Sequence, residues 1–225
     1  MPQTQDKTQE IDTKLSFQER NIKLSFKDKN DDEIKQLIIN DASNYVNLAL
    51  NIHGELNIGN MIRSSHLAGC KKFVIFGRRK YDKRSCVGVS HYMEIERIAG
   101  IKNQENTLKE ILDKDDYILD ENIFYNFIID NNYLPIFIEQ DKNSIQVNDE
   151  NIKNIIIHSK ELNLTPIFIY GNECVGIPKN IIDLQNKFPY SYILELKQKG
   201  VLQSYNVSNC LSIISYKVME NMDNI

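Results

Sequence analysis

Short apolar runs alternate with longer helix-like segments over most of the chain, and this alternation constrains the fold more than any other feature. Five runs rich in β-branched and aromatic residues predict strands, at residues 45–52, 72–76, 134–138, 166–170 and 192–196. The segments that follow them predict helices, at residues 58–70, 105–129, 148–162, 178–184 and 203–222. Strands that alternate with helices indicate an α/β fold with a parallel sheet. Because the runs are apolar throughout, we expect helices on both faces of that sheet.

The first 44 residues lie outside this alternation. The sequence KLSF occurs in them twice, at residues 14–17 and 23–26, as expected of two paired short strands or of one adhesive arm. We therefore divide the 225-residue chain into an N-terminal extension, residues 1–44, and one domain, residues 45–225.

Cysteine spacing and hydropathy indicate the cellular compartment. The start of the chain is polar and acidic, unlike a signal peptide, and no apolar run approaches the roughly 20 residues of a membrane span. The four cysteines are far apart and form no C-x-x-C pair, and the four histidines show no metal-ligand spacing. We therefore expect a cytoplasmic protein with no membrane segment and no metal.

Charge is concentrated in one segment. The net charge of −4 excludes a generally basic nucleic-acid coat, but residues 71–84 carry seven bases and one acid. This segment follows a predicted strand and contains Tyr81, and lysine or arginine beside an aromatic ring suits contact with phosphates and bases. The segment predicts either a site for RNA or another polyanion, or a solvated surface. The candidate RNA-binding residues are Arg78, Arg79, Lys80, Lys83 and Arg84.

Several widespread catalytic motifs are absent from the sequence. It has no G-x-x-x-x-G-K-[ST] phosphate loop, no G-x-G-x-x-G after the first strand, no H-E-x-x-H and no G-x-S-x-G. These absences argue against a P-loop nucleotidase, a Rossmann-type dinucleotide enzyme, a zinc metalloprotease and an α/β-hydrolase.

Three polar and glycine-containing segments each follow a predicted strand, where open α/β sheets bind ligands. They are Asn57–Arg63 (NIGNMIR), Gly171–Pro178 (GNECVGIP) and Gly200–Ser208 (GVLQSYNVS). Glycines let the backbone approach a ligand, and the start of a helix offers free N–H groups. Each segment alone has an ordinary explanation as well. Asn57, Ser204 or Asn206 is a suitable helix cap, and a glycine often serves only to turn the chain.

In order and context the three segments resemble the motifs of the SpoU (TrmH-like) RNA ribose 2′-O-methyltransferases, within the SPOUT α/β-knot superfamily. The family motifs N-x-G-x-x-x-R, G-x-E-x-x-G-[IL] and S-L-N-V-S correspond to Asn57, Gly59 and Arg63, to Gly171, Glu173, Gly176 and Ile177, and to Ser204, Asn206, Val207 and Ser208. The chain has Tyr205 where the family has leucine, and Leu196-Lys197 where it has an Ile-Pro pair. The second segment is especially similar to that of the eukaryotic tRNA D-loop guanosine enzymes of the family.

This resemblance implies a parallel sheet with a deep C-terminal trefoil knot, a homodimer, and S-adenosylmethionine (AdoMet) as cofactor without metal. It implies an RNA substrate, with tRNA favoured over rRNA, and an arginine that reaches the cofactor of the other subunit. The catalytic residues it implies are Arg63, Asn57, Glu173, Ser204 and Asn206. The cofactor-binding residues it implies are Gly171, Leu196, Leu202, Tyr205, Gly176 and Gly200.

Three alternatives stay open at this point. The chain fits an rRNA 2′-O-methyltransferase, a catalytically silent RNA-binding relative, or a methyltransferase that acts on a base or a protein. The joint presence of the five catalytic candidates argues against a silent relative, and the basic segment argues against a peptide substrate.

Overall fold

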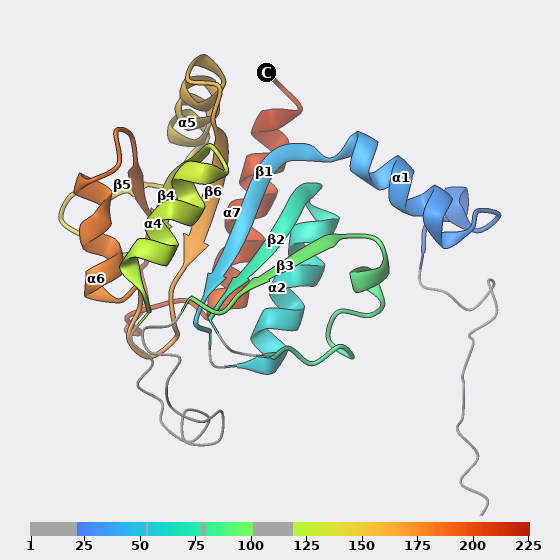
Figure 1. The fold of residues 1–225 in the computed structure, drawn as a ribbon, viewed down its shortest axis with the longest axis horizontal. Helices are drawn as coiled ribbons and strands as arrows, with labels where there is room; N and C mark the ends of the chain where they lie inside the picture. The colour runs from blue at the N-terminus through green and yellow to red at the C-terminus, as the bar shows by residue number, and fades with distance from the viewer. Residues whose placement is uncertain (1–21, 53, 78–79, 101–118) are drawn as a thin grey trace, which may run out of the picture.

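A seven-stranded sheet forms the centre of the computed structural model, which describes residues 22–52, 54–77, 80–100 and 119–225 (Figure 1). Its order is β3-β2-β1-β6-β4-β7-β5, and every neighbouring pair is parallel. The strands are β1 (Ser43–Leu50), β2 (Cys70–Phe76), β3 (Glu94–Ile98), β4 (Tyr133–Ile138), β5 (Ile145–Gln146), β6 (Thr165–Tyr170) and β7 (Tyr192–Glu195). The predicted α/β fold with a parallel sheet is confirmed.

Six α-helices lie within the described residues: α1 (Asp31–Asp41), α2 (Glu55–Leu67), α4 (Glu121–Asp130), α5 (Asp149–Glu161), α6 (Lys179–Ile182) and α7 (Val207–Met222). Short polar side chains set where four of them begin. Asn30, Asp120, Asn148 and Asn206 each accept a hydrogen bond from a backbone N–H of the first turn of α1, α4, α5 and α7.

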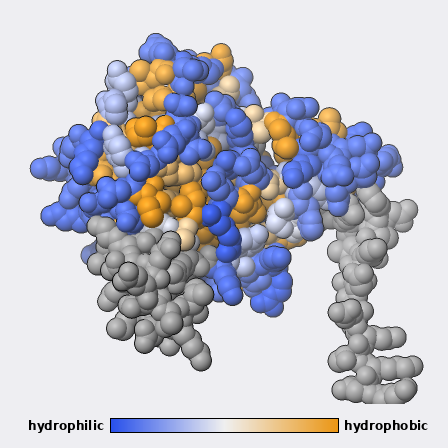
Figure 2. All heavy atoms as spheres, viewed as in Figure 1, coloured by the Kyte–Doolittle hydropathy of each residue, from blue (hydrophilic) through white to orange (hydrophobic). Residues whose placement is uncertain are grey.

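Two hydrophobic cores cover the two faces of the sheet. Helices α2, α5 and α7 pack on one face through fully buried side chains such as Met61, Ile152 and Leu211. Helices α4 and α6 pack on the other face through Phe124 and Ile181. This arrangement explains why the strands are apolar throughout, because successive side chains enter opposite cores. In the view of Figure 2 the surface over α1 is mainly hydrophilic, and hydrophobic residues show over α4 and the sheet.

All five predicted strands are present, with bounds shifted by one or two residues, but β3, β5 and α1 were not predicted. Strand β3 (EIERI) has three charged residues among its five, as suits an edge strand, and so lacks the apolar run used to find the others. On its paired neighbour β2, Lys72 forms ion pairs with Glu94 at 2.8 Å and with Glu96 at 3.0 Å. These ion pairs favour the pairing of the edge strand β3 with β2.

The last two predicted helices are shorter than expected. The helix predicted at 203–222 begins at Val207, because residues 203–206 belong to the preceding loop. The helix predicted at 178–184 is one α-helical turn, α6, followed by a 3₁₀ turn at Asp183–Asn186. Of the helix predicted at 105–129, residues 105–118 lie outside the described residues and the remainder is in α4.

The N-terminal extension contributes structure to the domain. Strand β1 begins at Ser43, inside the predicted extension, and α1 directly precedes it with Ile34 buried. The second KLSF copy is a 3₁₀ turn at Leu24–Phe26 rather than a strand, and the first copy lies outside the described residues. The division at residue 44 and the trefoil knot stay predictions. No helix of the described residues has the length and apolar character needed to cross a membrane.

Candidate active site

Four neighbouring strands bring the three polar segments together. Strands β1, β6, β4 and β7 are adjacent and parallel, so the loops that follow them emerge at one edge of the sheet. The first segment follows β1, the second follows β6 and the third follows β7. This edge is where open parallel sheets bind ligands.

A chain of hydrogen bonds joins one residue from each segment. The Asn57 side-chain amide donates to Glu173 Oε1 at 2.6 Å, and the Asn206 amide donates to Asn57 Oδ1 at 3.2 Å. Glu173 and Asn206 are 116 and 149 positions away from Asn57 in the sequence. Because Asn57 uses its donor for one partner and its acceptor for the other, it fixes both segments against α2.

The ordinary explanation as a helix cap holds for Asn206 but not for Asn57 or Ser204. Asn206 Oδ1 accepts from Ser208 N at 2.9 Å and so caps α7. Helix α2 is capped by Gly54, which places Asn57 at the third helical position, where its side chain is available to Glu173. Asn206 therefore has a structural role in α7 as well as its contact with the first segment.

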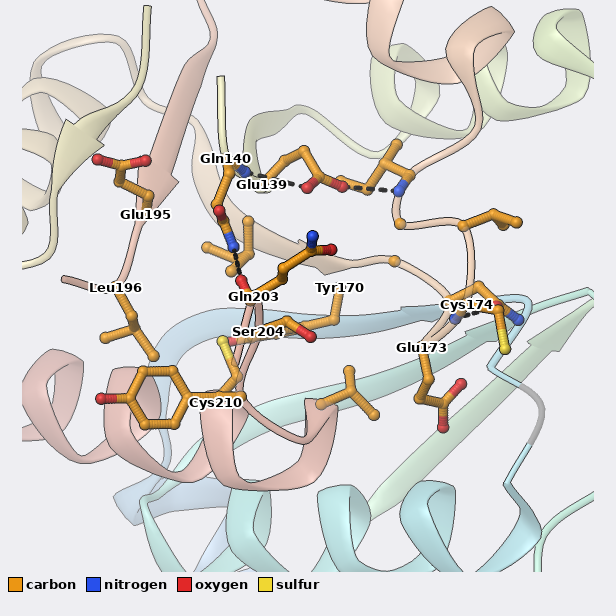
Figure 3. Close-up of a pocket in the computed structure, with 18 of the residues that line it drawn as sticks. Glu139, Gln140, Tyr170, Glu173, Cys174, Glu195, Leu196, Gln203, Ser204 and Cys210 are labelled. Atoms are coloured by element: carbon orange, nitrogen blue, oxygen red, sulfur yellow. Dashed lines mark hydrogen bonds between the residues drawn. The ribbon is translucent and has the colours of Figure 1, made fainter. Parts of the chain in front are cut away.

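A pocket of about 670 Å³ lies between the second and third segments (Figure 3), a volume typical of small-molecule sites. Six of the predicted site residues line it: Gly171, Glu173, Gly176, Leu196, Ser204 and Tyr205. Figure 3 shows the carboxylate of Glu173 turned toward α2, in keeping with its bond to Asn57. Apolar walls come from Ile138, Ile177 and Leu194.

Lack of space for a side chain explains why two positions of the second segment, 171 and 176, are glycine. A Cβ on Gly171 would lie 2.4 Å from the carbonyl carbon of Gly176 and 2.4 Å from Ile177 N, both backbone atoms. Gly176 has a φ of 67° and a Cβ there would lie 2.4 Å from Glu139 Oε2. The loop closes through paired backbone hydrogen bonds between Asn172 and Gly176, at 2.8 and 2.9 Å. Larger residues at either glycine would force this loop open.

Three predicted residues neither line the pocket nor join the hydrogen-bonded chain. Arg63 is exposed on α2, Leu202 is 78 % exposed, and nothing lies within 4 Å of a Cβ built on Gly200. Leu202 and Gly200 belong to the exposed part of the third loop. Arg63 shares a helical face with two exposed leucines, Leu56 (61 %) and Leu67 (69 %), since positions 7 and 11 residues after Leu56 align with it on an α-helix.

Sequence reasoning missed several residues that line the pocket. Glu139 and Gln140 follow β4, which contributes no motif, and Glu195 and Cys210 lie at the end of β7 and in α7. Their position in the sequence could have indicated Glu139 and Gln140. Polar residues directly after a central strand such as β4 lie at the same edge of the sheet as the other loops.

The end of the basic segment, from Asp82 onward, lies beside α2. Asp82 N donates to Glu55 O at 3.2 Å, and a Cβ on Gly59 would lie 1.6 Å from Ser85 Oγ and 2.9 Å from Asp82 O. Gly59, the glycine of the first motif, thus lets the turn at residues 82–85 pack directly on α2. This contact places residues 82–85, at the end of the basic segment, at the same edge as the pocket.

Three of the five candidate RNA-binding residues are described. Lys80 and Lys83 are exposed, whereas Arg84 forms an ion pair with Asp82 at 2.7 Å. Tyr81 is half-buried, with Arg97 over its ring at 5.2 Å, so its ring face is already covered on that side. Arg78 and Arg79 lie outside the described residues.

The four cysteines differ sharply in environment. Burial raises the pKa of the Cys70 and Cys210 thiols to about 12 and that of Cys86 to about 11, and Glu139 adds to the shift at Cys210. Cys174, in the second segment, is exposed. Only a thiolate reacts readily, so the other three thiols stay protonated and slow at neutral pH.

We expect a disulfide reagent at about pH 8 to modify Cys174 rapidly in the native protein and the other three cysteines only after denaturation. The absorbance of the released thiolate counts the reacting groups. Cys174→Ser should abolish the fast phase, and a second fast thiol in that variant would contradict the burial of the remaining cysteines.

At the level of sequence, no protein-family model matches the chain, and no curated protein does. Solved structures do resemble it. A TrmH/SpoU tRNA-modifying enzyme from A. aeolicus is similar over 86 % of this chain and 83 % of its own, at 14 % identity and a TM-score of 0.58. The SpoU methyltransferase AviRb from Streptomyces viridochromogenes, crystallised with AdoMet, is similar over 82 % of this chain and 62 % of its own, at 16 % identity and a TM-score of 0.54.

An AdoMet-bound rRNA methyltransferase from Sinorhizobium meliloti is similar over 83 % of this chain and 59 % of its own, at 14 % identity and a TM-score of 0.53. The chain thus spans less than two thirds of the length of the last two enzymes. Likeness at this level of identity establishes the architecture alone. The chain has the fold of the SpoU methyltransferases.

Proposed function

We propose that the chain is an AdoMet-dependent RNA methyltransferase of the SpoU family that methylates a ribose 2′-hydroxyl, with tRNA as its substrate. The observation that carries the proposal is the hydrogen-bonded chain Glu173–Asn57–Asn206, in which one polar residue from each family motif meets the others at the rim of the pocket. Helix capping and chain turning alone do not require these contacts across three loops. The GNECVGIP stretch and the tRNA-modifying structural neighbour support the choice of tRNA.

The pocket fits AdoMet in size and in chemistry. AdoMet combines an adenosine with a positively charged sulfonium, and the pocket combines apolar walls with the carboxylates of Glu173 and Glu195. The close approach of backbone at Gly171 and Gly176 keeps side chains out of it. The residues that would hold the cofactor are Gly171, Gly176, Leu196 and Tyr205. AdoMet supplies an activated methyl group on sulfur, so the protein has to prepare only the acceptor.

The ribose hydroxyl is a poor nucleophile that must be aligned and helped to lose its proton. Alignment removes much of the barrier, and a cation beside the developing alkoxide removes more. Arg63 is suited to this role as an electrostatic stabiliser and phosphate anchor, since a guanidinium stays protonated in proteins. Asn57 and Glu173 orient the acceptor side of the pocket, and Ser204 and Asn206 complete it.

We further propose that the active unit is a homodimer in which Arg63 serves the pocket of the other subunit. Arg63 lies outside the pocket of its own chain and between two exposed leucines, Leu56 and Leu67. On the neighbouring helix α7, Leu211, Ile214 and Val218 are buried on the sheet, while Ile213 and Tyr216 stay 40 % and 54 % exposed. This exposed apolar surface around Arg63 suits a subunit interface.

The test of the proposed activity is methyl transfer from labelled AdoMet to separated tRNA and rRNA, followed by mass spectrometry of the nucleosides. We expect a 2′-O-methylated nucleoside from tRNA, with chelator leaving the yield unchanged. Label confined to rRNA would contradict the substrate, label on a base would contradict the acceptor, and failure to bind AdoMet in calorimetry would contradict the enzyme.

The basic segment should supply most of the RNA affinity, because a chain with net charge −4 has no general attraction for RNA. We propose that Arg78, Arg79, Lys80, Lys83 and Arg84 bind its phosphates. Replacing Lys80 and Lys83 by alanine should weaken tRNA binding and reduce the slope of log K against log salt by about one unit for each phosphate that the variant no longer neutralises. Filter binding at several salt concentrations measures both.

The matched control is Lys153→Ala/Lys160→Ala, which removes two exposed lysines from α5. It should leave both the affinity and the slope unchanged. An equal effect of the two double variants would show general charge attraction and would remove the basic segment from the RNA site.

A further inference from the structure

Glu139 and Gln140 directly follow strand β4 and contact the two loops that form the pocket. These loops are residues 171–178 after β6 and residues 196–206 after β7. Glu139 is anchored from its backbone, since its N–H donates to Leu194 O of β7 at 3.1 Å. Neither residue belongs to the three motif segments, yet both line the pocket.

The carboxylate of Glu139 holds the first of these loops. Its Oε2 accepts a hydrogen bond from Ile177 N at 2.8 Å, and its Oε1 accepts one from Gln140 N at 3.0 Å. Hydrogen bonds from N–H groups to a carboxylate are stronger than neutral ones. The carboxylate also occupies the space that a side chain at position 176 would need, 2.4 Å from the ideal Cβ. Glu139 and Gly176 therefore fit together as a pair.

The side chain of Gln140 holds the second loop. Its amide donates to the carbonyl of Gln203 at 2.6 Å, and Figure 3 shows the two residues joined across the pocket. This hydrogen bond ties the second loop to the end of a central strand, 63 positions away in the sequence. Much of the same loop is solvated, with Val201 fully exposed and Leu202 at 78 %. Because so little of the loop is packed, its position over the pocket depends strongly on Gln140.

We propose that Glu139 and Gln140 are positioning residues that assemble the pocket before any ligand arrives. Two adjacent residues at the end of a central strand each hold one loop of the pocket, Glu139 through Ile177 N and Gln140 through Gln203 O. The identity of the ligand rests on the function proposed above, but the positioning itself is a property of the free protein. Preorganised loops lower the entropy lost when a ligand binds.

The first test uses the full chain without cofactor. Glu139→Ala should raise hydrogen exchange in residues 171–178, and Gln140→Ala should speed trypsin cleavage after Lys197 and Lys199, both exposed in the second loop. Each effect should be local to its own loop. Gln140→Glu keeps the length of the side chain but has no donor for the Gln203 carbonyl, so it should speed cleavage as Gln140→Ala does. Unchanged exchange and cleavage in the two alanine variants would overturn the proposal.

The matched control is Glu195→Gln, which removes a carboxylate from the same pocket. Glu195 accepts its hydrogen bond from the Gln146 side chain and from neither loop. We expect this variant to leave exchange and cleavage as in the wild type. Equal loosening in all three variants would assign the effect to pocket charge and overturn the positioning role. Because Gln140 is exposed, we expect Gln140→Ala to fold, so the proposal can be tested even if Glu139→Ala unfolds.

The second test compares AdoMet with its product S-adenosylhomocysteine, whose sulfur carries no charge, by calorimetry. Glu139→Ala should lower the affinity for both ligands by the same factor. We expect a factor of about ten, as for one missing hydrogen bond to a charged group. A weakening confined to AdoMet would show that Glu139 acts through its charge and would contradict the proposal. If the wild type binds neither ligand, the proposed function fails, while exchange and cleavage still decide whether Glu139 and Gln140 hold the loops.

Discussion

Arg63→Ala is expected to lower kcat/KM for RNA methylation by about 10²–10³-fold, the usual effect of removing one group that stabilises charge in a transition state. AdoMet affinity should change little, because in the proposed site Arg63 acts on the ribose acceptor and is not one of the cofactor-binding residues. Stability should change by less than about 0.5 kcal/mol, because the side chain is exposed on α2. Steady-state kinetics with tRNA, calorimetry with AdoMet and a thermal melt measure the three quantities.

Two further variants sharpen this result. Lys153→Ala removes an exposed cation from α5 and should leave the rate unchanged. Mixing subunits that carry Arg63→Ala with subunits that carry a pocket variant should restore activity if Arg63 acts across the dimer, because the mixed dimer then has one complete site. A collapse of AdoMet affinity in Arg63→Ala with turnover retained would reassign the arginine to the cofactor side.

Gly171→Ala is expected to open the loop at residues 171–178 and to lower AdoMet affinity by about tenfold or more. The free energy of unfolding should decrease by about 1–3 kcal/mol. The added Cβ would meet backbone atoms of Gly176 and Ile177 at 2.4 Å, and backbone cannot rotate away as a side chain can. Calorimetry and chemical denaturation measure the two effects.

The control for this variant is Gly200→Ala. Gly200 has no positive φ, lies outside the pocket lining, and offers an added Cβ no neighbour within 4 Å. The same chemical change should therefore leave affinity and stability close to wild type. Equal decreases in both variants would mean that the loop after β7 is packed more tightly than its exposure indicates.

The sequence predicts the core of the fold well because the central strands are buried on both faces. Runs such as PIFIY at β6 have no charged residues, and that composition suits only a covered strand. Strand β3 escapes the same reasoning because more than half of EIERI is charged, and its charges have partners such as Lys72 that only the folded sheet reveals. Helix α1 escapes because it lies before the alternation, although Asn30 and Glu33 form a capping box that marks its start.

The sequence predicts the motif loops but not the contacts among them. Glu173, Ser204 and Tyr205 line the pocket, because their loops follow strands that lie close together in the sheet, but their roles stay predictions. Position after a central strand indicates that Glu139 and Gln140 reach this edge, but it does not reveal their role, because their partners are backbone groups 38 and 63 residues away in the sequence. The position of Leu202 outside the pocket lining could not be predicted either, because the exposure of a loop residue depends on the path of the loop.

The packing of Gly59 against the turn at residues 82–85 limits how this protein can diversify. A family of enzymes can acquire new substrates by exchanging the loop that carries its basic residues, but here that loop is held against the helix that carries Asn57 and Arg63. The turn at residues 82–85 must therefore keep its fit to Gly59, whatever changes in the residues before it. Grafting a foreign segment before this turn, with Gly59 and a small residue at position 85 retained, is the route we expect to alter RNA choice without disturbing methyl transfer.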